Sequence, residues 1–124
     1  MCGIAGIMTT SGRVPDQVSL KRMAEALDHR GPESRGYFAL GNIGMVQNRL
    51  AIIDLKTGQH PLYEPGGAAL VGNGEIYNYL ELREDAALAG VNYATNSDFE
   101  PALYLYHWIG LAFVERPYAH QFAT

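Results

Sequence analysis

The sequence has little cysteine and little clustered positive charge, and each shortage excludes a class of protein. Cys2 is the single cysteine among 124 residues. Neither an internal disulfide nor a multi-thiolate metal site can therefore form, and we expect a cytoplasmic protein. Nine Lys and Arg stand against 13 Asp and Glu, and no basic run exceeds two residues. This balance gives no electrostatic basis for binding nucleic acid or an anionic membrane.

Long apolar segments are also missing. The longest apolar runs, such as residues 40–46, are interrupted by Gly and Asn. They fall well short of the roughly 20 residues that span a bilayer. No basic region precedes the apolar N-terminal residues, which argues against a signal peptide. We expect neither a membrane segment nor an export signal.

Patterns that bind metals or nucleotides are missing as well. The four histidines are far apart and share no metal-ligand spacing, so the sequence predicts no metal site. The chain also has no Gly-x-x-x-x-Gly-Lys-Ser/Thr loop, the pattern that cradles nucleotide phosphates. We expect no ATP chemistry in this segment.

The residues that are present predict one domain of mixed secondary structure. With 48% hydrophobic residues, a chain of this length can bury a core without disulfides or metal ions. Short strand-like runs occupy residues 3–8, 37–40, 43–47, 50–55 and 68–71, and residues 58–67 are expected to form a loop. Helical spacing occurs at 16–30, 80–88 and 99–106. This order predicts an α+β fold with helices packed on a largely antiparallel sheet.

Two of these elements carry detailed local signals. In the helix expected at 16–30, Asp16 is the expected N-cap, an apolar stripe is formed by Leu20, Met23, Ala24 and Leu27, and Gly31-Pro32 ends the helix. The strand-like runs 37–40 and 43–47 flank Gly41-Asn42 and predict a hairpin with a two-residue turn.

Cys2 is the residue with the strongest chemical potential. Methionine before a small residue is normally removed, and the thiol would then belong to the N-terminal residue itself. A free α-amino group has a pKa of about 7.7 to 8.0, so one residue could supply both nucleophile and base. A lone cysteine is more often a small buried hydrophobe. Its position before Gly3, second in the chain, favours the catalytic interpretation.

Four further segments combine polar residues with turn signals. They are His29-Arg30-Gly31-Pro32-Glu33, Asn48-Arg49-Leu50-Ala51-Ile52-Ile53-Asp54, Gly72-Asn73-Gly74-Glu75-Ile76-Tyr77-Asn78 and Asn96-Ser97-Asp98-Phe99-Glu100. Taken singly, Asn73-Gly74 is most often a turn, Arg49 a surface cation and Ser97-Asp98 a helix cap. Their value lies in their order along the chain after Cys2.

In this order the motifs resemble the class II glutamine amidotransferase domain of the glutamine-hydrolysing asparagine synthetases. That family begins with Cys-Gly-Ile and continues with His-Arg-Gly-Pro-Asp/Glu, Arg-Leu-Ser/Ala-Ile, Gln-Pro-Leu-Tyr, Asn-Gly-Glu-Ile-Tyr-Asn and Ser-Asp-x-Glu. His60 stands where the fourth motif has Gln. The resemblance covers about residues 2–116. Domains of the glucosamine-phosphate synthase and phosphoribosyl-amidotransferase kinds typically lack two of these motifs and therefore rank lower.

The resemblance implies hydrolysis of glutamine to glutamate and ammonia through a thioester on Cys2. The Cys2 amine would relay protons to the departing ammonia. The Asn73 side-chain amide and the Gly74 backbone N–H would stabilise the oxyanion. Arg49 would bind the α-carboxylate of glutamine, and Asp98 its α-ammonium group. Backbone groups in the stretch Leu50, Ala51, Ile52 and Ile53, together with the region of Glu75, would complete the pocket.

The resemblance also implies a fold and a partner. It implies an N-terminal nucleophile hydrolase, an αββα sandwich of antiparallel sheets, of which residues 2–124 would form a partial domain that is incomplete at its C-terminal side. The ammonia would serve the ATP-dependent amidation of aspartate in a synthetase domain or subunit. ATP and Mg are expected only there, because the chain has no Ser-Gly-Gly-x-Asp-Ser segment. No nucleic-acid or membrane partner is expected, and an oligomer is compatible with the sequence.

The last nine residues depart from the family pattern. Family members continue with a Gly-Met-Phe-Ala-Phe-Ala strand, a further Arg-Asp segment and a synthetase domain, and residues 116–124 match none of these. One alternative is therefore an inactive remnant, truncated or frameshifted. Another is an amidotransferase fragment that serves a sugar or peptide acceptor. The sequence alone leaves these alternatives open.

Overall fold

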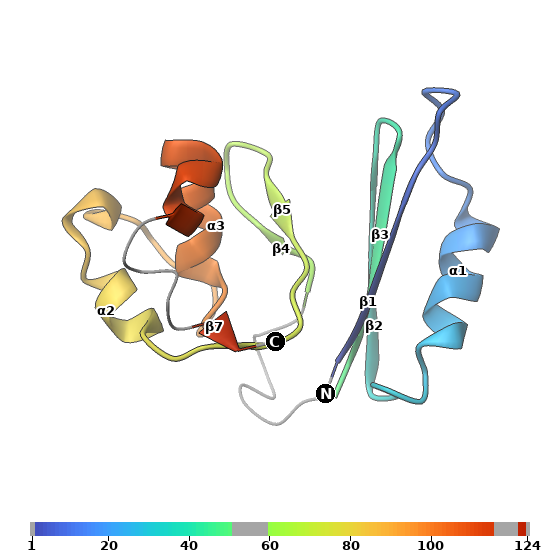
Figure 1. Cartoon of the computed structure of the whole chain (residues 1–124), viewed down its shortest axis with the longest axis horizontal. Coiled ribbons are helices and arrows are strands. Elements are labelled where there is room, and N and C mark those ends of the chain that lie inside the picture. The colour runs from blue at the N-terminus through green and yellow to red at the C-terminus, as the bar shows by residue number, and fades with distance from the viewer. Residues whose placement is uncertain (1, 51–59, 116–121, 124) are drawn as a thin grey trace.

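The computed structural model describes residues 2–50, 60–115 and 122–123. In Figure 1, the first helix and the strands around it lie side by side, and the later elements gather on the other side of these strands. The first part holds β1 (Gly3–Met8), α1 (Gln17–Ala26), β2 (Ser34–Leu40) and β3 (Ile43–Arg49). The second part holds β4 (Leu62–Tyr63), β5 (Ala69–Leu70), β6 (Glu75–Ile76), α2 (Tyr79–Arg83), α3 (Glu100–Ile109), β7 (Phe122–Ala123) and two 3₁₀ segments, η1 (Ala86–Leu88) and η2 (Gly110–Glu115).

The first part is a three-stranded antiparallel sheet in the order β1-β3-β2. β2 and β3 form the predicted hairpin. Its two-residue turn is Gly41-Asn42, where Gly41 adopts a positive φ of 57°. The hairpin is longer than predicted, because pairing continues as far as Arg49. β1 runs antiparallel to β3 on the other side, with Gly3 opposite Asn48. β3 is therefore the central strand.

α1 covers one face of this sheet. Its N-cap is Asp16, as predicted, and the Asp16 side chain accepts a hydrogen bond from the Ser19 backbone N–H at 2.8 Å. The regular helix ends at Ala26, and turns then lead to the Gly31-Pro32 stop. The predicted apolar stripe packs on the sheet. Leu20 and Ala24 of the helix are buried with Val46 of β3, and Met23 and Leu27 are partly buried together with Ala5 and Ile7 of β1.

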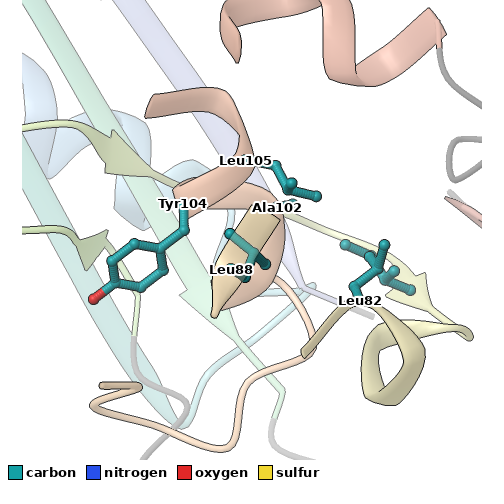
Figure 2. Close-up of a cluster of buried hydrophobic side chains, with 6 residues drawn as sticks. Leu82, Leu88, Ala102, Tyr104 and Leu105 are labelled. Carbon is teal, nitrogen blue, oxygen red and sulfur yellow. The ribbon is translucent and has the colours of Figure 1, made fainter. Parts of the chain in front are cut away.

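A second core forms around α3 (Figure 2). Its buried members come from β6, α2, η1 and α3; they are Ile76, Leu82, Leu88, Ala102, Tyr104 and Leu105. α3 begins at Glu100 with Pro101 directly after it, and proline suits the first turn because those N–H groups have no partner within the helix. Burial of these apolar side chains against one helix stabilises the short elements that follow residue 74.

The α+β class with antiparallel strands is confirmed, and two local predictions are wrong. The helix predicted at 80–88 is split into α2 and η1, because the Asp85 side chain accepts from the Ala87 N–H at 2.7 Å and starts a new turn. The loop predicted at 58–67 contains β4, which pairs with β5. Strands of two residues are too short for an alternating pattern to be recognised. The strand predicted at 50–55 lies almost wholly outside the described residues.

Among the described residues, no helix has both the length and the apolar character needed to cross a bilayer.

Candidate active site

Cys2 lies immediately before β1, at one end of the sheet (Figure 1). Its side chain is half-buried, and Sγ lies 3.9 Å from the carbonyl oxygen of Leu50. The Nε of Arg30 donates to the Cys2 carbonyl oxygen at 3.2 Å. A Cβ on the adjacent Gly3 would lie 3.1 Å from the Leu27 side chain, so a larger residue here would push that side chain away by a few tenths of an ångström. The backbone of the candidate nucleophile is thus fixed from the α1 side.

Strand pairing decides which side chains share a sheet face with Cys2. Residues directly opposite each other in an antiparallel pair point to the same face. Extending the register of β1 on β3 by one residue places Cys2 opposite Arg49. Val46 packs under α1, so strict alternation directs Gln47 and Arg49 to the other face. The candidate nucleophile and the candidate carboxylate anchor therefore share the sheet face turned away from α1.

The segment 72–76 meets the sheet at Gln47. The Gln47 side chain is buried and donates from Nε2 to the carbonyl oxygen of Gly72 at 2.7 Å. On its other side Gly72 packs on Phe99, so closely that a Cβ on Gly72 would lie 2.5 Å from the ring. A larger residue at this position would force the segment away from α3 or from the sheet.

Asn73 and Gly74, the predicted oxyanion residues, follow directly after this contact. Asn73 is half-buried and Gly74 is exposed. Gly74 has a φ of 153°, which L side chains rarely adopt and glycine tolerates. The backbone therefore adopts this conformation without a Cβ at an exposed position.

Asp98 lies against the far end of the same segment. Its Oδ2 accepts a hydrogen bond from the backbone N–H of Ile76 at 2.6 Å. Because the next residue, Phe99, packs on Gly72, two consecutive residues at the start of α3 contact both ends of the segment. The structure thus brings the candidate ammonium anchor next to the candidate oxyanion residues.

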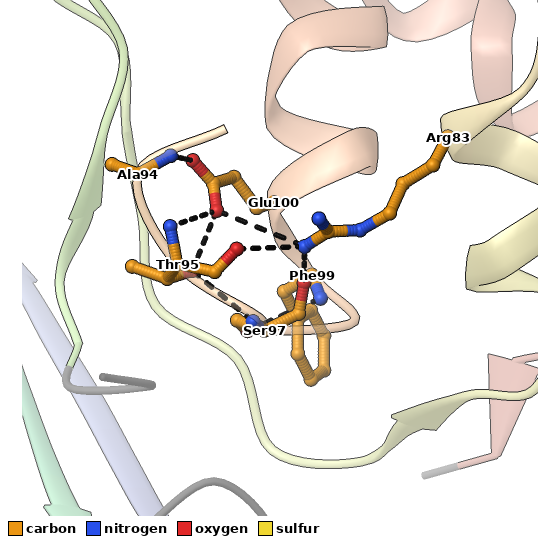
Figure 3. Close-up of polar contacts among 6 residues, drawn as sticks. All are labelled: Arg83, Ala94, Thr95, Ser97, Phe99 and Glu100. Atoms are coloured by element: carbon orange, nitrogen blue, oxygen red, sulfur yellow. Dashed lines mark hydrogen bonds and ion pairs between the residues drawn. The ribbon is translucent and has the colours of Figure 1, made fainter. Parts of the chain in front are cut away.

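The loop that carries Asp98 is organised by the buried carboxylate of Glu100 (Figure 3). Glu100 is 1% exposed. It accepts hydrogen bonds from the backbone N–H groups of Ala94 at 2.7 Å and Thr95 at 2.8 Å, and from the Thr95 hydroxyl at 2.5 Å. Charge-assisted bonds of this kind are about twice as strong as neutral ones. The turn before Asp98 is therefore fixed by the first residue of α3.

Arg83 completes this network from α2. Its Nη2 donates to the carbonyl oxygens of Thr95 at 2.8 Å and Ser97 at 3.3 Å, and lies 4.0 Å from the Glu100 carboxylate. Its guanidinium also lies 4.3 Å from the ring centre of Tyr93, a cation–π geometry. The positive charge compensates the buried carboxylate, which would otherwise be costly to remove from water.

His60 contributes a neutral ring to the same region. Its ring meets that of Phe99 edge to face, with 5.6 Å between the centroids. Burial, together with the nearby positive charge of Arg49, lowers the pKa of His60 to about 4. At neutral pH the ring is therefore uncharged and does not compete with Arg49 for an anion.

The remaining predicted pocket residues are only partly placed. Leu50 is described and contacts Cys2 through its carbonyl oxygen, whereas Ala51, Ile52 and Ile53 lie outside the described residues. Glu75 is exposed at the start of β6. In the described part of the chain, no three His, Cys, Asp or Glu side chains are grouped as metal ligands.

Sequence reasoning did not assign roles to several residues that organise this region. Arg30 and Glu100 lie inside motifs that were noticed, and a charged residue within a motif is a usable signal. The sequence suggested no role for Arg83 or Gln47, because neither residue carries a signal that a single sequence can show. Only the folded chain shows that Gln47 faces Gly72 and that Arg83 faces the loop before Asp98.

Comparison with known proteins identifies the class. Residues 1–122 match the model of the glutamine amidotransferase domain family, so the chain belongs to this family, as the motifs predicted. It is 40% identical over 119 residues to asparagine synthetase (glutamine-hydrolysing) 2 of Bacillus subtilis strain 168, covering 93% of this chain. It is 42% identical over 110 residues to the synthetase numbered 1 of the same strain, covering 86% of this chain.

A eukaryotic relative gives the same result. The chain is 38% identical over 120 residues to a probable glutamine-hydrolysing asparagine synthetase of Dictyostelium discoideum, covering 92% of this chain. These alignments span only 16%, 17% and 21% of the three relatives. The chain thus corresponds to about a fifth or less of the length of the proteins it matches.

Proposed function

We propose that this chain carries the glutamine-hydrolysing site of an asparagine synthetase-like enzyme. The main support is that Cys2 and Arg49 share the sheet face that the segment 72–76 meets at Gln47, and that Asp98 accepts a hydrogen bond from the same segment. These residues are distant in sequence and are linked through sheet register and hydrogen bonds. Membership of the glutamine amidotransferase domain family supports the same substrate.

The reaction would begin after removal of Met1. The Cys2 thiolate attacks the side-chain carboxamide carbon of glutamine, forming a C–S bond and an oxyanion. Collapse of this intermediate breaks the C–N bond, and the Cys2 ammonium supplies the proton with which ammonia departs. Water then hydrolyses the thioester to glutamate and restores the thiol. Cys2 thus supplies both the nucleophile and the group that transfers the proton.

Asn73 and Gly74 would stabilise the oxyanion with an amide N–H from each. Such donors accelerate the reaction only when they are in place before charge develops, and removal of one typically costs about 10²- to 10³-fold in rate. The glycine at position 74, with its unusual φ, allows the backbone N–H to approach the substrate closely.

Recognition of glutamine would rest on its two charged groups. Arg49 would pair with the α-carboxylate and Asp98 with the α-ammonium group. The backbone of residues 50–53 and the region of Glu75 would line the rest of the pocket. The neutral His60 ring beside Arg49 adds no second positive charge at this position.

The use of the ammonia is a further part of the proposal. A synthetase domain or subunit would consume it in the ATP-dependent amidation of aspartate, with ATP and Mg bound there. The three relatives are named as asparagine synthetases, which supports this acceptor. We also propose that the complete glutaminase domain is an αββα sandwich of the N-terminal nucleophile hydrolase type; the antiparallel sheet under α1 is compatible with it.

Release of ammonia from glutamine tests this function. Mass spectrometry first establishes that Met1 is absent from the purified chain, because a retained methionine would place the Cys2 amine in a peptide bond. We expect glutamine-dependent ammonia release that Cys2→Ala abolishes. Equal background rates for the two proteins would reject the proposal for this polypeptide.

A further inference from the structure

Gln47 is a polar side chain buried in the middle of the central strand, with 3% of its surface exposed. Burying an amide costs free energy unless its polar atoms are hydrogen-bonded. Its Nε2 donates to the carbonyl oxygen of Gly72, but its Oε1 has no hydrogen-bond partner among the described residues. An apolar side chain of similar size would avoid this orphaned acceptor, so fold stability alone does not explain glutamine at this position.

Gln47 stands between the two parts of the proposed site. Across the sheet it pairs with Ile4, two residues after Cys2. Its side chain holds Gly72, the residue immediately before Asn73. One hydrogen bond of 2.7 Å therefore joins the strands that carry the nucleophile to the segment that carries the oxyanion residues.

The contacts on the other side of this segment do not provide the same constraint. Asp98 and Phe99 fix the segment relative to α3, through the Ile76 N–H and the packing on Gly72. The hydrogen bond from Gln47 fixes the position of the segment relative to β3 and, through strand pairing, relative to β1. The distance between thiol and oxyanion donors depends on this second constraint.

We propose that Gln47 is a positioning residue that sets the distance between the Cys2 thiol and the oxyanion donors at Asn73 and Gly74. The inference rests on the proposed roles of these three residues. Preorganised donors lose most of their effect when they are displaced, and a shift of about 1 Å can cost about 10²-fold in rate. Gln47 acts through Gly72 and does not itself contact the substrate.

Replacement of Gln47 by Met tests the proposal, because Met keeps the approximate volume and removes the donor. Gln17→Met on the exposed surface of α1 is the matched control. In the full chain we expect ¹⁵N order parameters for Asn73 and Gly74 of about 0.85 in the wild type and in Gln17→Met, and values below about 0.6 in Gln47→Met. Amides of β1 and β3 keep their wild-type values.

A second, kinetic measurement follows glutamine hydrolysis by the same proteins. We expect kcat to fall by about 10- to 100-fold in Gln47→Met while KM for glutamine changes little, because the α-carboxylate and α-ammonium anchors are untouched. If Gln47→Met does not fold, Gln47→Glu replaces it in both measurements. That variant keeps the shape and turns a carboxylate oxygen toward the Gly72 carbonyl, so the same loss is expected.

The outcomes separate this inference from the proposed function. A wild-type chain that releases no ammonia would overturn the function, and the order parameters would still decide the role of Gln47. Unchanged order parameters at Asn73 and Gly74 in the variant would overturn the positioning role. Increased mobility throughout both halves of the chain would also overturn it, because it would show a general structural role.

Discussion

Arg49 is one of the two proposed anchors for glutamine. It shares a sheet face with Cys2, and a charge-assisted bond to a carboxylate contributes about 1.5 to 3 kcal/mol. Replacement of Arg49 by Leu should therefore raise KM for glutamine by about 10- to 100-fold. Steady-state ammonia release measures this change. Arg22→Leu, at an exposed position on α1, serves as the control, and an equal KM in the two variants would contradict the assignment.

His60 should make the stability of the fold depend on pH. Its pKa of about 4 in the folded chain lies below the ordinary value of 6.5. Between these two values the unfolded chain binds a proton that the folded chain does not. The free energy of unfolding should therefore fall, by about 2 to 3 kcal/mol, as the pH is lowered from about 6.5 to about 4, and this contribution is constant above pH 6.5.

The His60→Gln variant isolates this contribution. Urea unfolding between pH 7 and pH 4.5 should show a flatter dependence on pH for the variant than for the wild type. The exposed His29 provides the matched change, His29→Gln, which should keep the wild-type dependence. Identical slopes for the wild type and His60→Gln would show that burial of the His60 ring does not control its protonation.

For single residues, the sequence identified candidate site residues, but it did not predict their surroundings in the folded chain. Cys2, Arg49, Asn73 and Asp98 could be proposed because their motifs occur in a recognisable order. The neutral state of His60 could not, because it follows from burial and from the approach of Arg49. Ion pairing and desolvation between distant segments exist only after the chain has folded.

Among the elements, the start of α3 has the clearest structural role. Glu100 accepts three hydrogen bonds from residues 94 and 95 and lies 4.0 Å from Arg83. In Glu100→Gln an amide N–H₂ would face one of these donors, which leaves buried groups unsatisfied. We expect a loss of about 1 to 3 kcal/mol in the free energy of unfolding, measured by urea denaturation. Glu81→Gln, an exposed change on α2, should leave the midpoint unchanged; equal midpoints for the two variants would contradict the role of Glu100.

The elements that were predicted correctly are those with a strong local signal. α1 has a capping aspartate and an apolar stripe, and the β2-β3 hairpin has strands on both sides of a two-residue turn. The strand predicted at 68–71 contains β5, whereas its partner β4 could not be predicted, because two paired residues carry no periodicity. The break between α2 and η1 depends on a single side-chain bond from Asp85, which competes with continuation of the helix.

For the whole molecule, the proposed function depends on the arrangement of the two parts. α1 covers one face of the first sheet, and the segment that follows β5 meets the other face at Gln47 (Figure 1). The α+β class followed from the order of the elements. The placement of Cys2 and Arg49 on the sheet face that the segment 72–76 meets did not, because the strand order β1-β3-β2 and the contacts across it are non-local.

The central claim is that Cys2 is the nucleophile of a glutamine-binding site, and covalent labelling tests it most directly. In the chloroketone analogue of glutamine, –CH₂Cl replaces the amide nitrogen. A thiolate displaces chloride, so a C–S bond forms as the C–Cl bond breaks. The account predicts one label per chain, mapped to Cys2, with a rate that saturates with reagent and is slowed by free glutamine. Labelling that does not saturate, that glutamine does not slow, or that persists in Cys2→Ala would contradict it.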